Sequence, residues 1–221
     1  KYKTLISKAR EYHNRLPKLD KQYKCAVRRG YIDWNHMQRD DLERIMNFLN
    51  GWGRCRLERK VFIHRFPETY NKTRPLLEPF RDLRLEDFDF DRLFDVGTER
   101  MKACRIIHLA FDELASARHS GPTATSKVLH LFSPSFFVMW DRSICCETYK
   151  LRPNGYDYAN SFLPEMQDRI QGVIDDVTRC KRFQRQEAIE YIHGETLRIC
   201  KFSKSLAKII DEYNFTKAHP R

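Results

Sequence analysis

The stretch from Gly121 to Ile144, GPTATSKVLHLFSPSFFVMWDRSI, carries the clearest structural plan in this chain of 221 residues. After a Gly-Pro turn, Thr123 is the expected N-cap of a helix that runs to Phe132, where a Ser-Pro-Ser tripeptide ends it, because proline removes a helical N–H donor. The apolar strip Phe136–Trp140 follows, and Asp141 stands where the next helix begins. This order predicts a helix, a buried strip and a further helix whose start carries a carboxylate.

The residues before this stretch predict a partner helix, so that the two form a hairpin. Thr98 is a favoured N-cap residue, and Glu99 places a negative charge in the first turn, where the helix dipole stabilises it. Apolar residues at spacings of three and four continue to about residue 119. A Ser-Gly-Pro turn then joins this helix to the next. Residues 98–132 are therefore expected to form a helix-hairpin-helix-like element.

Most of the remaining chain also shows the apolar spacing of amphipathic helices. The chain holds only eight glycines and nine prolines, and no segment has the pattern of a β-hairpin. Pro164 lies inside one helical pattern, so that helix either starts later or kinks there. The other predicted helices cover residues 2–14, a segment after Pro17, and residues 38–49, 158–177 and 199–213. We therefore expect an all-α fold.

The helices are expected to form two lobes with a cleft between them. The composition turns acidic over residues 82–95, which is the best candidate for a boundary. Residues 1–90 would form a mixed helical lobe with a basic N-terminal region. Residues 91–221 would form a helical lobe that holds the hairpin-like element and Asp141. One integrated domain is the alternative, since a chain of this length fits one domain or two small ones.

The charge of the chain points to a phosphate-bearing partner. Lysine and arginine number 41 against 30 acidic residues, a net charge of +11. Residues 1–30 hold ten basic and two acidic side chains, and further basic clusters lie at residues 54–60 and 179–185. Basic clusters of this kind are typical of proteins that bind nucleic acids. Any single cluster also fits a solvated helix face.

Several classes of protein are excluded or disfavoured. A content of 41% hydrophobic and 32% charged residues argues against a disordered chain, and the apolar runs are too short to span a membrane. The seven cysteines are odd in number and form no CxxC pair, which favours reduced thiols in a cytoplasmic protein, nucleoid-associated if prokaryotic. No HExxH, P-loop, GxSxG or dinucleotide-binding motif occurs, so we expect no metal and no cofactor.

A helical hairpin followed by a carboxylate suits chemistry on a nucleic acid. Two short helices joined by a tight turn aim backbone N–H groups at a phosphate. The helix dipole favours the ionised form of a carboxylate at a helix start, such as Asp141. A carboxylate in this position can stabilise the oxocarbenium-like sugar cation that forms when a base leaves, and it can orient the attacking water.

This plan resembles the helix-hairpin-helix DNA glycosylase superfamily over about residues 100–150. Members place an Asp in an apolar-Asp-x-x-apolar context, matched here by Val138–Ile144, and bifunctional members carry a lysine near the start of the second hairpin helix, matched by Lys127. Gly121 lies six residues before Lys127, whereas the family's GxG turn directly precedes the lysine. The resemblance implies a DNA N-glycosylase that flips a damaged or modified base out of double-stranded DNA and leaves an abasic site. Asp141 would stabilise the sugar cation, and Lys127 would contact the DNA or form a Schiff base as an AP lyase.

Further residues are expected to hold the DNA or the flipped base. Trp52 stands between two glycines in a basic turn, where an aromatic ring can stack on a base or wedge the duplex. Trp140 and His130 are the other candidates for the base pocket. The expected DNA contacts are Thr123, Ser126, Arg142, Arg54, Arg56 and Lys60. We expect the protein to act as a monomer.

The sequence leaves a structural explanation open for each of these residues. Asp141 is a favoured helix cap whether or not it is catalytic. Lys127 could be a phosphate contact or a surface lysine, and His130 on an apolar helix could be a packed core residue. Trp52 and Trp140 could serve only to fill the core.

Two other functions compete with the glycosylase hypothesis. The chain could be a non-enzymatic helical nucleic-acid-binding protein that uses the same basic clusters without catalysis. It could also be an interaction module whose basic faces meet an acidic protein. For a glycosylase, the sequence leaves open which base is excised, and whether excision serves base-excision repair or defence against phage DNA with modified bases.

Overall fold

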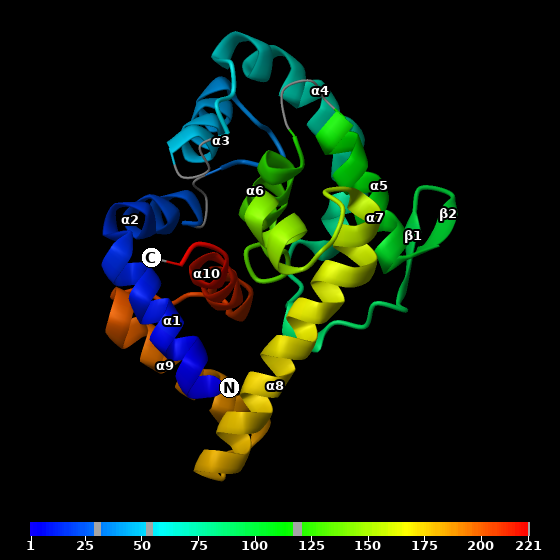
Figure 1. The fold of residues 1–221 in the computed structure, drawn as a ribbon. Helices are drawn as coiled ribbons and strands as arrows, with labels where there is room; N and C mark the ends of the chain where they lie inside the picture. The colour runs from blue at the N-terminus through cyan, green and yellow to red at the C-terminus, as the bar shows by residue number, and fades with distance from the viewer. Residues whose placement is uncertain (29–31, 52–54, 117–120, 221) are drawn as a thin grey trace.

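A computed structural model describes residues 1–28, 32–51, 55–116 and 121–220 (Figure 1). Helices take up 71% of the described residues, and the only sheet among them has two strands. The predicted all-α character is thereby confirmed. The α-helices are α1 (Tyr2–Arg15), α2 (Pro17–Ala26), α3 (Arg39–Gly51), α4 (Arg59–Leu77), α5 (Ala103–Ser116), α6 (Pro122–Phe132), α7 (Gly155–Asp157), α8 (Leu163–Lys181), α9 (Arg185–Cys200) and α10 (Leu206–Ala218).

Shorter elements connect these helices. Two 3-10 turns, η1 (Glu78–Phe80) and η2 (Leu85–Asp87), lead to the strands β1 (Leu93–Val96) and β2 (Glu99–Lys102). Two π-helical segments, η3 (Ser143–Thr148) and η4 (Tyr158–Phe162), lie between α6 and α8.

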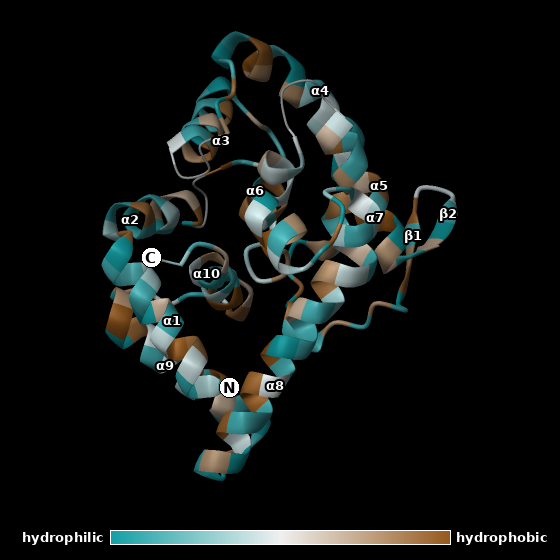
Figure 2. Cartoon of the chain, in the orientation of Figure 1, coloured by the Kyte–Doolittle hydropathy of each residue, from teal (hydrophilic) through white to brown (hydrophobic). Residues whose placement is uncertain are grey.

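One continuous core of buried side chains extends from Leu5 on α1 to Ile210 on α10. Helix α1 packs against α9 and α10, so the first helix and the last two lie side by side (Figure 1). Hydrophilic and hydrophobic residues alternate along α1 and α8, the pattern of helices with one buried face (Figure 2). Buried residues of 1–90 and of 91–221 belong to the same core, and the division into two lobes stays a prediction.

The predicted start of the helix over residues 98–119 is wrong. Residues 93–102 form a β-hairpin, in which Val96 pairs with Glu99 and Leu93 with Lys102. Gly97 occupies the turn with a φ of +60°, a conformation that glycine adopts without steric cost. Thr98 therefore lies in the turn rather than at an N-cap, and α5 begins only at Ala103. The hairpin has only four paired residues on each side, too few to produce a clear strand pattern in the sequence.

The second half of the predicted helical hairpin is present as α6. Pro122 lies in its first turn and Gly121 is its N-cap, so the expectation that Thr123 caps this helix is wrong. Helix α6 packs against α5. Residues 117–120, which join the two helices, lie outside the described part of the chain, so the helix-hairpin-helix element itself stays a prediction.

Two further helices differ from the sequence expectations. The predicted helix over 199–213 is interrupted, because Lys201 has a φ of +62° and a new helix starts after Ser205, whose hydroxyl accepts the N–H of Lys208 at 3.1 Å. Helix α4 was not predicted, and it contains Pro67 and Pro75. Pro164 lies in the first turn of α8, which starts at Leu163, and the π-helical segment η4 leads directly into this helix.

In the part of the chain that the structure describes, no helix has both the length and the apolar character needed to cross a membrane.

Candidate functional site

Lys127 and Asp141, the two residues predicted to be catalytic, line the same cavity. The cavity has a volume of about 340 Å³ and lies between α1, α2, α6 and α10, within the size range of about 300–1,000 Å³ typical of small-ligand pockets. Helix α6 supplies Lys127, and Asp141 follows the buried strip Phe136–Trp140. Its other lining residues are Tyr12, Arg15, Leu16, Leu19, Met139, Trp140, Ile144, Asp211, Phe215 and His219.

Asp141 is held by two contacts, one on each carboxylate oxygen. Oδ1 accepts the backbone N–H of Ile144 at 2.9 Å, and Oδ2 lies 2.9 Å from Nε2 of His219. About a quarter of the side chain is exposed. Asp141 therefore does stabilise the start of η3, as the structural explanation predicted, and it also faces the cavity. The two explanations are compatible, because capping uses one oxygen only.

His219 was missed by the sequence analysis. Its backbone carbonyl accepts a hydrogen bond from Arg15 at 2.9 Å, and its ring lies 4.5 Å from the ring of Phe215. These contacts hold the imidazole beside Asp141. A single histidine close to a chain end carries no sequence signal that links it to an aspartate 78 residues earlier.

Lys127 is almost completely buried, with 6% of its surface exposed. Burial lowers the pKa of its ammonium group, since a low-dielectric surrounding disfavours the charged form, while Cys55, Asp141 and Asp211 oppose that effect. A lowered pKa increases the fraction of neutral amine, which is the nucleophilic form. The prediction that Lys127 might be a surface lysine is wrong.

Ser126 has a structural role in place of the predicted DNA contact. Its side chain is fully buried. The hydroxyl oxygen lies 3.0 Å from the carbonyl oxygen of Trp140, and it accepts the backbone N–H of the same residue at 3.2 Å. It also lies 3.1 Å from the carbonyl oxygen of Thr123. Ser126 thereby ties α6 to the strip that ends at Asp141, and it fixes how Lys127 and Asp141 stand relative to each other.

His130 is a core residue, and the prediction that it lines the base pocket is wrong. The ring is fully buried and is not part of the cavity lining. Nδ1 is bonded to the carbonyl oxygen of Phe137, which requires the proton on Nδ1, and Nε2 accepts the hydroxyl of Tyr23 at 2.9 Å. Burial lowers the pKa of His130 to about 3, so the ring is neutral.

Replacing His130 by asparagine is expected to flatten the pH dependence of stability. The unfolded chain takes up a proton near pH 6.5, whereas the folded chain does so only near pH 3. The stability from the neutral ring is present above pH 6.5 and is lost as the pH falls towards 3, by about 1.4 kcal/mol per pH unit. Urea denaturation at about pH 7, 6 and 5 should show a steeper loss for the wild type than for His130→Asn. Equal slopes would contradict this assignment.

Trp140 is packed in the core and also contributes to the wall of the cavity. It is 1% exposed, and its ring lies 4.9 Å from that of Tyr158 and 5.0 Å from that of Phe162. Among the described residues its indole N–H has no hydrogen-bond partner. Its role as a base-pocket residue stays a prediction.

The remaining predicted DNA contacts lie at the surface or outside the described residues. Arg142, Arg56 and Lys60 are exposed, and Thr123 is half-buried. Arg142 directly follows Asp141, so its side chain starts next to the cavity. The predictions for Trp52 and Arg54 fall on residues 52–54, which the structure does not describe.

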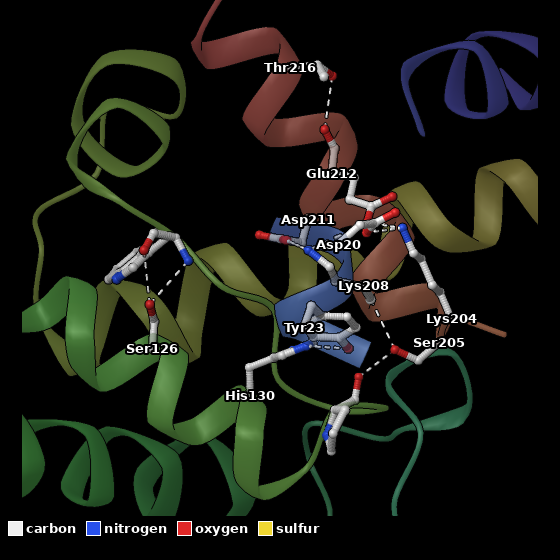
Figure 3. A network of polar contacts seen from close by, with 12 residues as sticks. Asp20, Tyr23, Ser126, His130, Lys204, Ser205, Lys208, Asp211, Glu212 and Thr216 are labelled. Carbon is white, nitrogen blue, oxygen red and sulfur yellow. Dashed lines mark hydrogen bonds and ion pairs between the residues drawn. The ribbon is translucent and has the colours of Figure 1, made fainter. Parts of the chain in front are cut away.

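A buried network of charged side chains lies next to the cavity (Figure 3). Lys204 donates to Asp20 and Glu212, at 2.6 Å each. Lys208 donates to Asp211 at 2.7 Å and lies 3.6 Å from Glu212. Burial raises the pKa of Glu212 to about 7, an effect that the two lysines oppose. The sequence offered one signal for this network: Lys208, Asp211 and Glu212 interrupt an otherwise apolar helix face.

The fold also brings together three residues that have the donor atoms of a metal site. Potential ligand atoms of His13, Asp20 and Cys200 lie within 4.8 Å of one another. These residues lie up to 187 positions apart, so no local motif in the sequence indicates the group. Asp20 is already bonded to His13 at 2.5 Å and to the Lys204 ammonium at 2.6 Å. The ammonium group occupies the place of a cation, so we assign the three residues to the buried network.

Comparisons of the chain with protein-family models, with curated proteins and with solved structures found no match.

Proposed function

We propose that this protein is a DNA N-glycosylase that acts on a damaged or modified base. The observation that carries the proposal is the shared cavity of Asp141 and Lys127, a carboxylate and a buried amine that come from different elements. Each residue alone has a structural explanation. Together they line a cavity of ligand size. The carboxylate suits excision of a base, and the amine suits cleavage of the DNA strand at the resulting abasic site.

The surface beside the cavity supports a DNA partner. Helix α2 lines the cavity with Leu19, and its exposed lysines Lys18 and Lys21 line a neighbouring groove of about 400 Å³. Arg44 on α3 lines the same groove. A basic groove next to the cavity would hold the phosphates of the strand that carries the flipped nucleotide.

The reaction would use Asp141 as an anion beside the sugar. As the C1′–N bond breaks, positive charge develops on the sugar ring, and a carboxylate held by Ile144 and His219 stabilises that charge without having to reorganise. The same carboxylate can take the proton of the water that attacks C1′. The product is an abasic site.

An abasic-site assay tests the proposal. The protein is incubated with duplexes that carry oxidised, alkylated, deaminated or mismatched bases, and with phage DNA rich in modified bases; half of each sample is then heated in alkali. Breaks that need alkali establish a glycosylase and identify its substrate class. Tight, salt-sensitive binding without breaks on any substrate would instead establish a non-enzymatic nucleic-acid-binding protein.

Replacing Lys127 by methionine is expected to abolish any break that forms without alkali. A Schiff base between the Lys127 amine and C1′ of the opened sugar is the step that permits such a break, and methionine fills a similar volume without a nucleophile. Borohydride reduction during the reaction should trap a covalent protein–DNA adduct with the wild type and none with Lys127→Met.

Alkali-dependent breaks serve as the internal control, because base release does not need the amine. An adduct that persists in Lys127→Met would show that another amine forms the Schiff base.

A further inference from the structure

Asp211 is a second carboxylate in the wall of the cavity, and no sequence motif pointed to it. It lies on α10, is 2% exposed and lines the cavity together with Asp141 and Lys127. The nearby carboxylate of Glu212 belongs to the buried network and is not among the lining residues. Two carboxylates of unequal burial therefore face one cavity.

The contacts of Asp211 leave one of its oxygens available to the cavity. Lys208 donates to Oδ2 at 2.7 Å. In Figure 3 a carboxylate oxygen of Asp211 points towards the side of Ser126 and α6, away from Lys204. A proton on the oxygen that does not accept from Lys208 would face the cavity.

The surroundings of Asp211 differ from those of Asp141. Burial raises the pKa of Asp211, Lys208 and Lys127 oppose this effect, and Asp141 adds to it. The charged groups that face Asp211 are Lys208 on its own helix, Lys127 on α6 and Asp141 at the start of η3; the neutral side chains of Tyr12, Tyr23 and Tyr158 face it as well. When two carboxyl groups in one site have unequal surroundings, one can keep its proton and act as an acid while the other stays ionised.

We propose that Asp211 is the general acid of this cavity and protonates the base as it leaves. This inference rests on the proposed glycosylase function. The C1′–N bond breaks and its electron pair goes to the base, which takes the proton from Asp211. Water forms the new C1′–O bond and gives its proton to Asp141. Exchange with solvent then returns the proton to Asp211 and leaves Asp141 ionised.

The test compares Asp211→Asn with the wild type on two kinds of base. A neutral lesion such as hypoxanthine leaves slowly unless it is protonated, whereas 7-methylguanine already carries a positive charge and leaves as a neutral molecule. Single-turnover release of the neutral base should fall by about 100-fold or more in Asp211→Asn, while release of 7-methylguanine should change by less than about fivefold.

Glu212→Gln is the matched control, because Glu212 is equally buried beside Lys208 but does not line the cavity. It should leave the ratio of the two release rates unchanged. Thermal denaturation and DNA binding of both variants separate a loss of fold from a loss of chemistry.

The remaining outcomes distinguish the two proposals. Equal losses on both bases in Asp211→Asn, or an equal change of the ratio in Glu212→Gln, would overturn the general acid and leave the glycosylase function standing. Release of only the cationic base by the wild type would also overturn it, because no proton donor would then be needed. A wild type that releases no base from any duplex would overturn the glycosylase function itself.

Discussion

Asp141→Asn is expected to lower the rate of base release by at least about 100-fold, the effect of removing one preorganised charge from a transition state. Asparagine keeps the acceptor that caps Ile144, so the start of η3 should persist. It removes the negative charge beside the sugar and the acceptor of the water proton. Single-turnover release on the substrate identified in the abasic-site assay measures the loss, and thermal denaturation should show a stability near that of the wild type.

Asp112→Asn is a closely matched control. Asp112 also accepts a backbone N–H, that of Gly155 at 2.7 Å, and also pairs with a histidine, His108 at 2.9 Å. It does not line the cavity. Asp112→Asn should therefore leave base release unchanged. Equal activity of Asp141→Asn and the wild type would reduce Asp141 to a helix cap, and the DNA-binding hypothesis would then take precedence.

Lys208→Met is expected to destabilise the protein by about 3–5 kcal/mol, the loss typical of breaking a buried ion pair from one side. The ammonium group lies 2.7 Å from Asp211 and 3.6 Å from Glu212, and it stacks over the rings of Tyr12 and Tyr23 at 4.9 and 4.7 Å. Without it, the buried carboxylate of Glu212 loses one of its two counter-charges, and the buried Asp211 loses the donor to its Oδ2. Urea denaturation at neutral pH measures the change.

A surface ion pair serves as the control for this loss. Lys72 lies 2.9 Å from Glu68, and both side chains are more than half exposed. Lys72→Met should change stability by less than about 1 kcal/mol. Combining Lys208→Met with Glu212→Gln should restore part of the loss, because the buried negative charge of Glu212 is then removed as well. A loss of stability below about 1 kcal/mol for Lys208→Met would show that the carboxylate of Glu212 does not depend on this counter-charge.

The helical class of the fold was predictable because it depends on local periodicity. Apolar residues at helical spacing located α1, α3, α6 and α8 to within a few residues. The helix boundaries were predicted wrongly where one local sequence pattern favoured a helix and another favoured a turn. Thr98 had the chemistry of an N-cap, but Gly97 allowed a tight turn and β1 could pair with β2. Helix α4 was missed because its two internal prolines resemble breaks.

The candidate site was only half predictable. The place of Asp141 at a helix start marked that residue, and the resemblance to the glycosylase superfamily marked Lys127. His219 and Asp211 carry no such pattern, and they reach the cavity only because α10 packs against α1 and η3. Ser126 and His130 were predicted to contact the DNA and the flipped base, respectively. Both side chains are buried, and their polar atoms bind backbone carbonyl groups instead.

The helical class, the excess of basic charge and the candidates Lys127 and Asp141 could be read from the amino-acid sequence alone, because composition, periodicity and motifs are local properties. Helix packing brings these two residues into one cavity, adds Asp211 and His219 to its wall and buries Ser126 and His130. Burial and charge pairing between segments up to about 200 residues apart depend on how the helices pack, and packing is a collective property that no single stretch of sequence contains.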